Sequence, residues 1–476
     1  MVFSSLVFLC VFLPTVFLLY TIIPVHKVRN GLLIVFSLVF YAYGEPIYVF
    51  LMIISSLVNF LCALFIGKSE TKSRKKLFLI IAVALNLGTL AVFKYTGMLI
   101  ASVNSLMRLS IPSPEIVLPI GISFYTFQAL SYVIDVYRGE VGVQKNYFRV
   151  LLYISFFPQL IAGPIVKYRD IADQIEHRSQ SVEQTAQGFR RFICGLAKKV
   201  LIANTMGQAA DIIFSQSTSS LGVLSSWLGA VAYLFQIFYD FSGYSDMAIG
   251  LGKMFGFTFK ENFLYPYGAD SVRVFWRRWH ISLSTWFKEY LYIPLGGNRK
   301  GKARTALNRI IVFFFTGLWH GANWTFVLWG LWHGMFLMLE QYLPVLKKLP
   351  KAIGHIYTML VVLLGFVLFR SDTISFGFGY IGRMFSFGGT GSFDASLALQ
   401  QLTPWFILML AAAVVGCAPI RPLADRIRRA LYSDGTASKA RTALDTALYC
   451  IAFLALIFCL LRLSPSGYNP FIYFRF

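Results

Sequence analysis

The sequence has too few charged residues to cover the surface of a water-soluble protein. Only 13% of its 476 residues are Asp, Glu, Lys or Arg, whereas hydrophobic residues make up 57% and aromatic residues 17%. A soluble domain carries about 25% charged residues. This shortage excludes a soluble enzyme or binding domain, and it predicts that lipid is the main solvent of the chain.

Acidic residues are especially scarce. There are 21 Asp and Glu against 43 Lys and Arg, which gives a formal net charge of +22. Such an excess can indicate a nucleic-acid partner, but here the basic residues lie in short loops between apolar runs. Membrane topology and anionic lipid headgroups account for that distribution. We therefore expect membrane lipid as a partner and no nucleic acid.

Several motifs of well-known enzyme classes are also missing. There is no GxSxG, no HExxH and no Walker A sequence, and none of the six cysteines forms a CxxC pair. We therefore expect neither a disulfide framework nor a metal site. The cysteines are Cys10, Cys62, Cys194, Cys417, Cys450 and Cys459.

What the sequence does contain is a series of apolar runs, many of them long enough to cross a hydrocarbon core of about 30 Å. Allowing for splits, they predict roughly ten to twelve crossings and an all-α, polytopic membrane protein. The runs are 5–24, 31–43 with 46–67, 77–99, 116–137, 148–166, 221–252, 307–342, 353–369, 404–420 and 443–462.

The first apolar run does not have the pattern of a cleaved signal peptide. No basic residue precedes it, no small-residue cleavage site ends it, and Lys27 and Arg29 follow it. The positive-inside rule then places Lys27 and Arg29 in the cytoplasm and the N-terminus outside. The next basic linker, 67–76, is two crossings later, which agrees with this orientation.

We interpret the chain as one membrane domain over residues 1–476. Residues 1–100 are expected to be scaffold helices, 118–340 the catalytic core, and 345–476 C-terminal helices. Within the core, residues 253–309 are too charged to cross a bilayer and unusually aromatic. They predict interfacial helices on the cytoplasmic side, ending in a turn at Gly296-Gly297-Asn298.

Two copies of GLWHG, in "GLWHGANWTFVLWGLWHG", place His320 and His333 in an apolar stretch. On one unbroken helix, 13 residues mean about 20 Å of rise and roughly 140° of rotation, so the two imidazoles would not share a site. Gly321-Ala322-Asn323 is a candidate helix break, and a break at membrane depth faces protein or a cavity. This favours His320 as the working imidazole, with His333 as a supporting or packing residue.

Other polar residues lie in or beside apolar segments. His280 follows "FWRRW" at the predicted inner interface and is either an ordinary interfacial residue or part of the active site. Asp240, Ser242 and Tyr244 either line a polar, substrate-binding cavity or tie helices together by hydrogen bonds. The glycines of "GYSDMAIGLGKMFG" (243–256) suit close helix packing better than a dinucleotide fold.

Five long segments carry a resemblance to a known family. They are "LPIGISFYTFQALSYVIDVYRG" (118–139), "FFPQLIAGPI" (156–165), "YDFSGYSDMAIGLGKMFGF" (239–257), "FWRRWHISLSTWFKEYLYIPLGGNRKG" (275–301) and "TGLWHGANWTFVLWGLWHG" (316–334). With them the chain resembles the membrane-bound O-acyltransferases, in the bacterial branch of the alginate O-acetyltransferase membrane subunits. The resemblance spans nearly the whole chain.

The resemblance implies a reaction, a fold and two catalytic residues. The histidine of WHG carries over to His320 and that of RWHISLS to His280, with Trp319 beside the first. The implied donor is an acyl thioester such as acetyl-CoA on the cytoplasmic side, with no permanently bound cofactor. The implied acceptor is reached from the outer side: an extracytoplasmic polysaccharide such as alginate, another exopolysaccharide, peptidoglycan or a partner protein that relays the acetyl group would each suit. The implied fold is a ring of helices around a central funnel. The implied location is a bacterial inner membrane.

The residues themselves favour the same reaction. Transfer of an acetyl group to a hydroxyl needs a base, and an imidazole suits that work near neutral pH. No Ser or Cys is evidently activated, which favours direct transfer. The chain has no extracytoplasmic domain to recognise a polymer, so we expect a periplasmic partner protein. The main alternative is a polysaccharide or small-molecule transporter without transferase activity, but no second copy of the 240–334 pattern supports it.

A basic cluster near the predicted inner face is the candidate site for the donor's phosphates, and Asn323 at the helix break is a further candidate for substrate binding. Arginine in particular binds phosphate in a bidentate way. The alternative is that these basic residues only obey the positive-inside rule. The cluster comprises Arg277, Arg278, Lys288, Arg299 and Lys300.

Overall fold

The computed structural model describes residues 1–386, 391–418, 439–464 and 467–472. Within these ranges every regular element is a helix. The first half of the chain forms α1 (Leu13–Ile22), α2 (His26–Ala42), α3 (Tyr48–Lys68), α4 (Lys72–Met107), α5 (Ile122–Arg138), α6 (Tyr147–Ser155), α7 (Phe157–Leu160), α8 (Tyr168–Glu176), α9 (Val182–Ala197), α10 (Asn204–Phe214) and α11 (Val223–Met254), with π-helical turns at Phe8–Phe12 and Lys198–Ala203.

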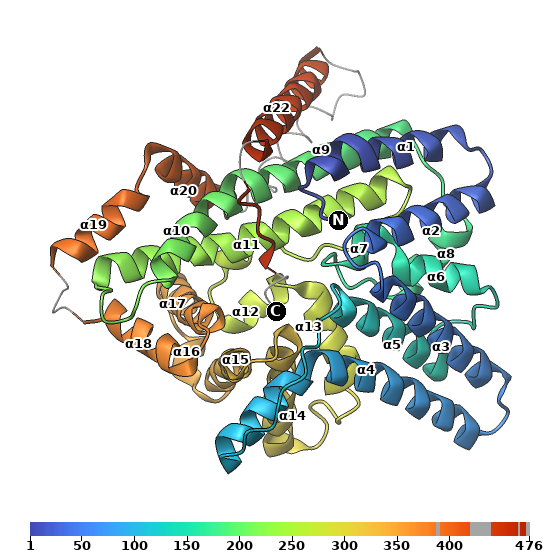
Figure 1. Cartoon of the computed structure of the whole chain (residues 1–476), viewed down its shortest axis with the longest axis horizontal. Helices are drawn as coiled ribbons and strands as arrows, with labels where there is room; N and C mark the ends of the chain where they lie inside the picture. The colour runs from blue at the N-terminus through green and yellow to red at the C-terminus, as the bar shows by residue number, and fades with distance from the viewer. Residues whose placement is uncertain (387–390, 419–438, 465–466, 473–476) are drawn as a thin grey trace.

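The second half begins with short helices and returns to longer ones. These are η3 (Pro266–Gly268), α12 (Val272–Arg278), α13 (Ile281–Phe287), η4 (Lys288–Tyr292), α14 (Gly301–His320), α15 (Trp324–Tyr342), α16 (Pro344–Lys347), α17 (Lys351–Arg370), α18 (Ile374–Met384), α19 (Ser392–Gln401), α20 (Pro404–Gly416) and α22 (Lys439–Leu463). In Figure 1, α12 and α13 lie between the long helix α11 and the pair α14–α15.

Local sequence signals fix many of the helix ends. Thr71 and Ser181 each accept a hydrogen bond from the backbone N–H three residues later, which satisfies an otherwise unpaired group of the first turn. Helix α5 lies between Gly121 and Gly139, both in the left-handed region at φ 78° and 74°. Glycine adopts that conformation without steric cost, so both ends of α5 are encoded in the sequence.

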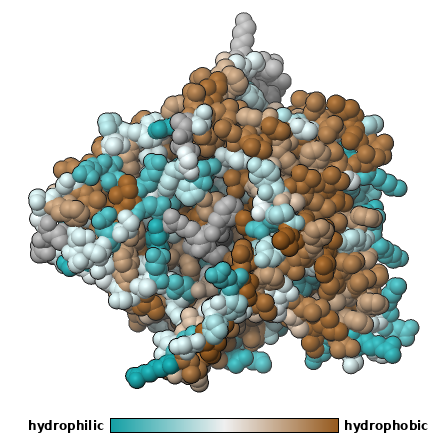
Figure 2. Space-filling model, in the orientation of Figure 1, coloured by the Kyte–Doolittle hydropathy of each residue, from teal (hydrophilic) through white to brown (hydrophobic). Residues whose placement is uncertain are grey.

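Four helices of the described residues are both long and apolar enough to cross a membrane, or five spans if one bent pair is counted. The four are α3, α4, α17 and Thr442–Leu463, and the pair is α19 with α20, bent by 73°. Only 17% of the most apolar window of α4 and 11% of that of Thr442–Leu463 are buried. Such helices present apolar side chains outward and need lipid around them. Figure 2 shows hydrophobic residues covering much of one side of the molecule.

Several predicted spans are broken. The run 148–166 contains α6, the short α7 and an irregular stretch, and the run 307–342 is divided between α14 and α15. The predicted count of ten to twelve crossings therefore stays a prediction. The turn expected near Gly296 is present, with Gly296 and Gly297 at φ 106° and 54°.

One expectation about residues 253–309 is wrong. We expected the aromatic residues of this segment to lie at the headgroup surface, but most of them face the protein interior. Trp276, Trp279 and Trp286 are each at most 9% exposed, and Phe275 is fully buried. The segment folds into short helices whose aromatic sides pack inward while their charged side chains remain outside. Composition alone does not distinguish that arrangement from an interfacial helix.

The glycine-rich stretch 243–256 packs helices together, as predicted. A Cβ on Gly195 of α9 would lie 2.5 Å from the carbonyl oxygen of Gly243 in α11, and a Cβ on Gly188 would lie 2.7 Å from that of Gly250. Helices approach this closely only where small residues face each other. The closely packed pair α9–α11 runs alongside the central short helices α12 and α13 (Figure 1).

Candidate active site

The helix predicted to break at Gly321-Ala322-Asn323 does break there. Helix α14 ends at His320, Gly321 is extended, and α15 begins at Trp324. The side-chain oxygen of Asn323 accepts a hydrogen bond from the backbone N–H of Thr325 at 3.1 Å, which caps α15. His320 is thus the last residue of α14, at a helix terminus inside the protein.

The two GLWHG copies meet through their first glycines, where α14 crosses α15. A Cβ on Gly317 would lie 2.2 Å from the carbonyl oxygen of Phe326, and a Cβ on Gly330 would lie 2.2 Å from that of Phe313. The Gly330 Cβ would also lie 3.2 Å from the Cα of Gly317. The helices therefore touch backbone to backbone, and the repeated motif is explained by this crossing.

His320 lies in an aromatic enclosure and is 6% exposed. Its ring centroid is 5.0 Å from that of Trp329 and 5.3 Å from that of Phe369. The ring of His280 lies 6.3 Å away, although 40 positions separate the two residues in the sequence. The structure thus brings together the two histidines that the sequence singled out as catalytic candidates.

A lysine that the sequence reasoning missed holds the end of α14. The Nζ of Lys94, on α4, donates to the carbonyl oxygens of Trp319 at 2.6 Å and His320 at 3.3 Å, and to the hydroxyl of Ser123 at 3.3 Å. A cation at a helix C-terminus binds the unpaired carbonyls and complements the helix dipole. The sequence did contain a signal for this residue. Lys94 lies inside the apolar run 77–99, and ionisable residues at membrane depth are rare.

His280 is buried rather than interfacial, so the alternative of an ordinary surface histidine is wrong. It is 1% exposed, and its ring lies 4.6 Å from that of Phe241 and 6.0 Å from that of Trp319. Its backbone is in the left-handed region, at φ 43°. A non-glycine residue in that region is uncommon. In this conformation the backbone of His280 directs the imidazole differently from the side chain of a helical residue.

His333 occupies a different position from His320. It is fully buried, and its ring lies 5.2 Å from those of both Trp276 and Trp329. Neither ring nitrogen has a hydrogen-bond partner within the described residues. Trp329 lies between the two histidines, because it also contacts His320.

Two cavities lie along α14 near His320. A cavity of about 440 Å³ lies along the middle of α14, from Arg309 to Thr316, and is lined by residues of α12, α13, η4 and α14. A smaller one of about 90 Å³ lies at the C-terminus of α14 and is lined by Lys94 and His320, and also by Trp319. Thr316 precedes His320 by about one helical turn, so the larger cavity reaches to within one turn of the histidine that lines the smaller one.

The basic cluster predicted for donor binding is only partly assembled. Arg277 and Lys288 line the larger cavity. Arg278 donates to the carbonyl oxygen of Gly268 instead, and Arg299 and Lys300 are exposed beyond the lining residues. Two arginines that were not predicted from the sequence, Arg273 and Arg309, also line this cavity.

Most of the polar residues selected on α11 tie segments together. Asp240 pairs with Lys199 at 2.7 Å and accepts the backbone N–H of Ile472 at 2.8 Å. Tyr244 stacks between Phe3 and Phe471, at 4.5 and 4.6 Å. Neither Asp240 nor Tyr244 is among the residues that line these cavities, and their contacts agree with the alternative that they tie segments together. The physical reason is that α11 is covered on this side by the chain termini.

Two other candidates line cavities whose walls include residues that contact the histidine pair, namely Asn262 beside His280 and Phe369 beside His320. Ser242 contributes to a polar cavity of about 180 Å³ that Asp246 and Asn262 also line. Asn323 contributes to one of about 290 Å³ near Arg370, and its side-chain nitrogen donates to the carbonyl oxygen of Asp372 at 2.8 Å.

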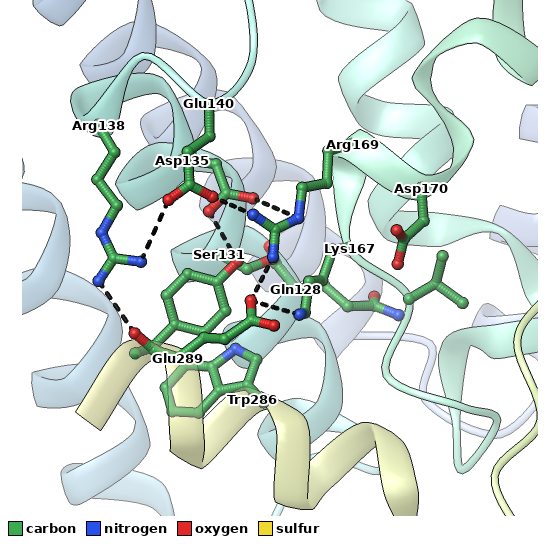
Figure 3. Close-up of polar contacts among 12 residues, drawn as sticks. Gln128, Ser131, Asp135, Arg138, Glu140, Lys167, Arg169, Asp170, Trp286 and Glu289 are labelled. Carbon is green, nitrogen blue, oxygen red and sulfur yellow. Dashed lines mark hydrogen bonds and ion pairs between the residues drawn. The ribbon is translucent and has the colours of Figure 1, made fainter. Parts of the chain in front are cut away.

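An ion-pair network fixes the wall of the larger cavity. Glu289, on η4, pairs with Lys167 at 2.6 Å and with Arg169, and Arg169 also pairs with Glu140 and lies 3.8 Å from Asp135 (Figure 3). The network joins η4 to the end of α5 and to the start of α8.

Glu289 remains ionised in this network. Burial alone would raise the pKa of its carboxyl group, but hydrogen bonds from Lys167 and Arg169 hold it below its usual range. Because η4 also carries Lys288 and Tyr292 of the cavity lining, the network positions part of the cavity wall at neutral pH.

Comparison with known proteins assigns the site to a family. The model of the membrane-bound O-acyltransferase family matches residues 140–369, which include both catalytic candidates. A probable alginate O-acetylase of Pseudomonas putida is 40% identical to the chain, with all of both chains aligned. The chain belongs to the membrane-bound O-acyltransferase family. This membrane-bound O-acyltransferase is therefore an enzyme, and the transporter alternative is set aside.

Further relatives of this membrane-bound O-acyltransferase act on different acceptors, according to their names. A peptidoglycan O-acetyltransferase of Helicobacter pylori is 35% identical over 79% of this chain and 78% of its own. A teichoic acid D-alanyltransferase of Bacillus subtilis is 27% identical over 58% of this chain and 76% of its own.

Proposed function

We propose that this enzyme transfers an acetyl group from a cytoplasmic thioester, acetyl-CoA, toward hydroxyl groups of an extracytoplasmic polysaccharide such as alginate. A periplasmic protein partner would deliver or relay the group. The observation that carries the proposal is the His320–His280 pair, 6.3 Å apart, with a cavity lined by basic residues one turn before His320 on α14 and a second cavity at the C-terminus of that helix. The full-length relatives named as alginate O-acetylases support the acceptor class.

The reaction needs one proton acceptor and no further co-reactant. His320 takes the proton of the acceptor hydroxyl as its oxygen attacks the thioester carbonyl carbon. The carbon–sulfur bond then breaks, and the thiolate leaves with that proton as a free thiol. The acyl group ends as an ester on the acceptor oxygen. Much of the rate comes from holding both substrates in line inside an enclosed site.

The proposal includes a membrane arrangement. Roughly ten to twelve crossings would surround a central funnel in a bacterial inner membrane, with the N-terminus outside. The basic loops near Lys27 and Arg29 and the basic lining of the larger cavity would then share the cytoplasmic side. The smaller cavity, at Lys94 and His320, would open toward the acceptor.

Sidedness of transfer tests this function. The enzyme would be placed in sealed vesicles with its periplasmic partner, with radiolabelled acetyl-CoA on one face and alginate oligosaccharides on the other. We expect labelled esters only when the thioester is on the face that carries Lys27 and Arg29, as read by protease accessibility of an engineered tag. Labelling from the opposite face, or hydrolysis of acetyl-CoA without ester formation, would contradict the proposal.

Charge reversal tests the donor's position. Arg277→Glu and Lys288→Glu, which change the cavity lining, are expected to raise the KM for acetyl-CoA about tenfold, because each removes a phosphate contact and adds repulsion. Arg299→Glu and Lys300→Glu are matched controls at exposed positions and are expected to change KM less than about twofold, as a solvent-screened charge does. Equal changes in KM at all four positions would mean that these basic residues only set the membrane topology.

A further inference from the structure

Asn262, in the loop between α11 and α12, lies beside His280 although 18 positions separate them. The backbone N–H of Ile281 donates to the carbonyl oxygen of Asn262 at 3.0 Å. The backbone N–H of Leu264 donates to the carbonyl oxygen of Arg278 at 2.9 Å. These two bonds run the segments 262–264 and 278–281 alongside each other. Asn262 is 1% exposed, so its side chain faces the protein interior.

The orientation of the Asn262 amide is determined by its neighbours. Its oxygen accepts the backbone N–H of Ser282 at 3.1 Å and the Ser282 hydroxyl at 2.9 Å, and its nitrogen donates to the Ser245 hydroxyl at 3.1 Å. A backbone N–H only donates, so an amide nitrogen in that place would face another donor. The oxygen of Asn262 must therefore be the atom on the side of Ser282.

That oxygen also lies 3.3 Å from Nδ1 of His280. Since an amide oxygen only accepts, Nδ1 must carry the proton and donate it. The hydrogen bond made by one ring nitrogen sets the state of the other, so Nε2 of the neutral ring carries a lone pair. Nε2 is buried and has no hydrogen-bond partner in the part of the chain that the structure describes.

We propose that Asn262 is a positioning residue that fixes His280 as the Nδ1–H tautomer and so presents Nε2 as a second proton acceptor beside His320. This inference rests on the proposed function and assigns His280 a definite task within it. With Nε2 unprotonated, His280 does not donate a hydrogen bond to the negative charge that develops on the thioester carbonyl. It accepts a hydrogen bond instead.

The distance between the two imidazoles indicates which group donates a hydrogen bond to His280. With ring centroids 6.3 Å apart, the rings are too distant for a direct N–H···N bond, which needs about 3 Å between nitrogens. They are close enough for one oxygen atom to reach both. The acceptor hydroxyl is such an oxygen. Because it carries a single proton, it donates first to Nε2 of His280, which holds it in place, and then to His320, which removes the proton as the oxygen attacks. That proton leaves with the thiolate when the carbon–sulfur bond breaks.

The backbone conformation of His280 points to the same role. Only three non-glycine residues in the described ranges have positive φ, and His280 is one of them, at 43°. A residue held in the left-handed region is retained where its surroundings determine it. Here the carbonyl oxygen of Asn262 binds the next N–H of the chain while its amide oxygen binds the imidazole, so one residue sets both the backbone and the ring.

Substitutions of Asn262 test the proposal kinetically. Asn262→Ala removes the amide oxygen that accepts the hydrogen bond from Nδ1 of His280. It is expected to lower kcat about 10- to 100-fold, as loss of a histidine-orienting partner typically does. The KM for acetyl-CoA should stay within about twofold, because Asn262 does not line the donor cavity. Asn262→Asp keeps an oxygen for Nδ1–H and should retain most of the activity. Equal loss in both variants would overturn the assignment.

A matched control separates this effect from the loss of any buried amide. Asn59 on α3 is also fully buried, and its side chain exchanges hydrogen bonds with Asn86 at 3.1 and 2.8 Å, far along the chain from the site. Asn59→Ala should keep the wild-type kcat in the fraction that folds. A loss of kcat equal to that of Asn262→Ala would assign both effects to packing.

The tautomer can be observed directly. In protein labelled with ¹⁵N-histidine, the signals missing from His280→Gln identify His280, and nitrogen shifts distinguish the two neutral tautomers. We expect Nδ1–H in the wild type and its loss in Asn262→Ala. An Nε2–H ring in the wild type would overturn the inference whatever the kinetics. If His280→Gln is fully active, the proposed function of this residue fails; if only Asn262→Ala is fully active, the inference alone fails.

Discussion

His320→Ala is expected to lose at least about 100-fold in acetyl transfer, because it removes the base from a step in which general-base catalysis contributes 10²- to 10⁴-fold. The carbonyl oxygen that Lys94 binds belongs to the backbone, so that contact survives the substitution. Expression and thermal stability in detergent should therefore stay close to those of the wild type. Transfer is measured with a thioester donor, the purified enzyme and its acceptor partner.

His333→Ala is the matched control, since His333 is also buried and contacts the same Trp329. It should cost less than His320→Ala, and a reversed order would mean that the other GLWHG copy holds the base. Adding His280→Ala completes the comparison. If His280 and His320 act on one hydroxyl, the double variant should lose little more than the worse single variant. Multiplicative losses would place His280 outside the catalytic unit.

Gly330→Ala is expected to have the largest effect on folding. Its Cβ would lie 2.2 Å from the carbonyl oxygen of Phe313, and neither backbone can yield without separating α14 from α15. Overpacking of this kind costs about 1–3 kcal/mol and often more where backbone is involved. We expect a clear fall in the melting temperature together with loss of transfer, because the same crossing fixes the end of α14 at His320.

Gly88→Ala is the control for that substitution. Gly88 lies within α4, and nothing approaches within 4 Å of the Cβ that alanine would add. Alanine is the better helix former by about 1 kcal/mol, so this variant should be at least as stable as the wild type. An equal loss of stability at Gly88 and Gly330 would contradict the close crossing.

The sequence predicted the helix break at His320 because its signal is local. Glycine, alanine and asparagine follow one another directly after the histidine, and in the structure Asn323 caps the helix that follows. The family assignment was also accessible, since it rests on long ordered segments. The apolar runs predicted an all-helical membrane protein because they too are a local signal. They do not reveal where a helix bends or ends within a run.

Contacts between distant segments were not predictable. Nothing in the sequence near Asn262 indicates a partner at His280, because the pairing depends on two loops running side by side. The aromatic residues around Trp276 were expected at a lipid headgroup surface, and only the packing of α12 and α13 shows that they are buried. Lys94 differs from these, since its charge within an apolar run was a usable signal.

The crossing at Gly317 and Gly330 also has a consequence for specificity. It positions the histidine-bearing end of α14 by main-chain contact, whereas the neighbouring cavity of about 440 Å³ is walled by side chains such as Leu283 and Phe287. If this cavity holds the donor, as proposed, exchanging a large wall residue for a smaller one would lengthen the space for an acyl chain without moving the backbone that carries His320. Under the proposed function, the acyl length could then diverge in this scaffold while the chemistry of transfer stays the same.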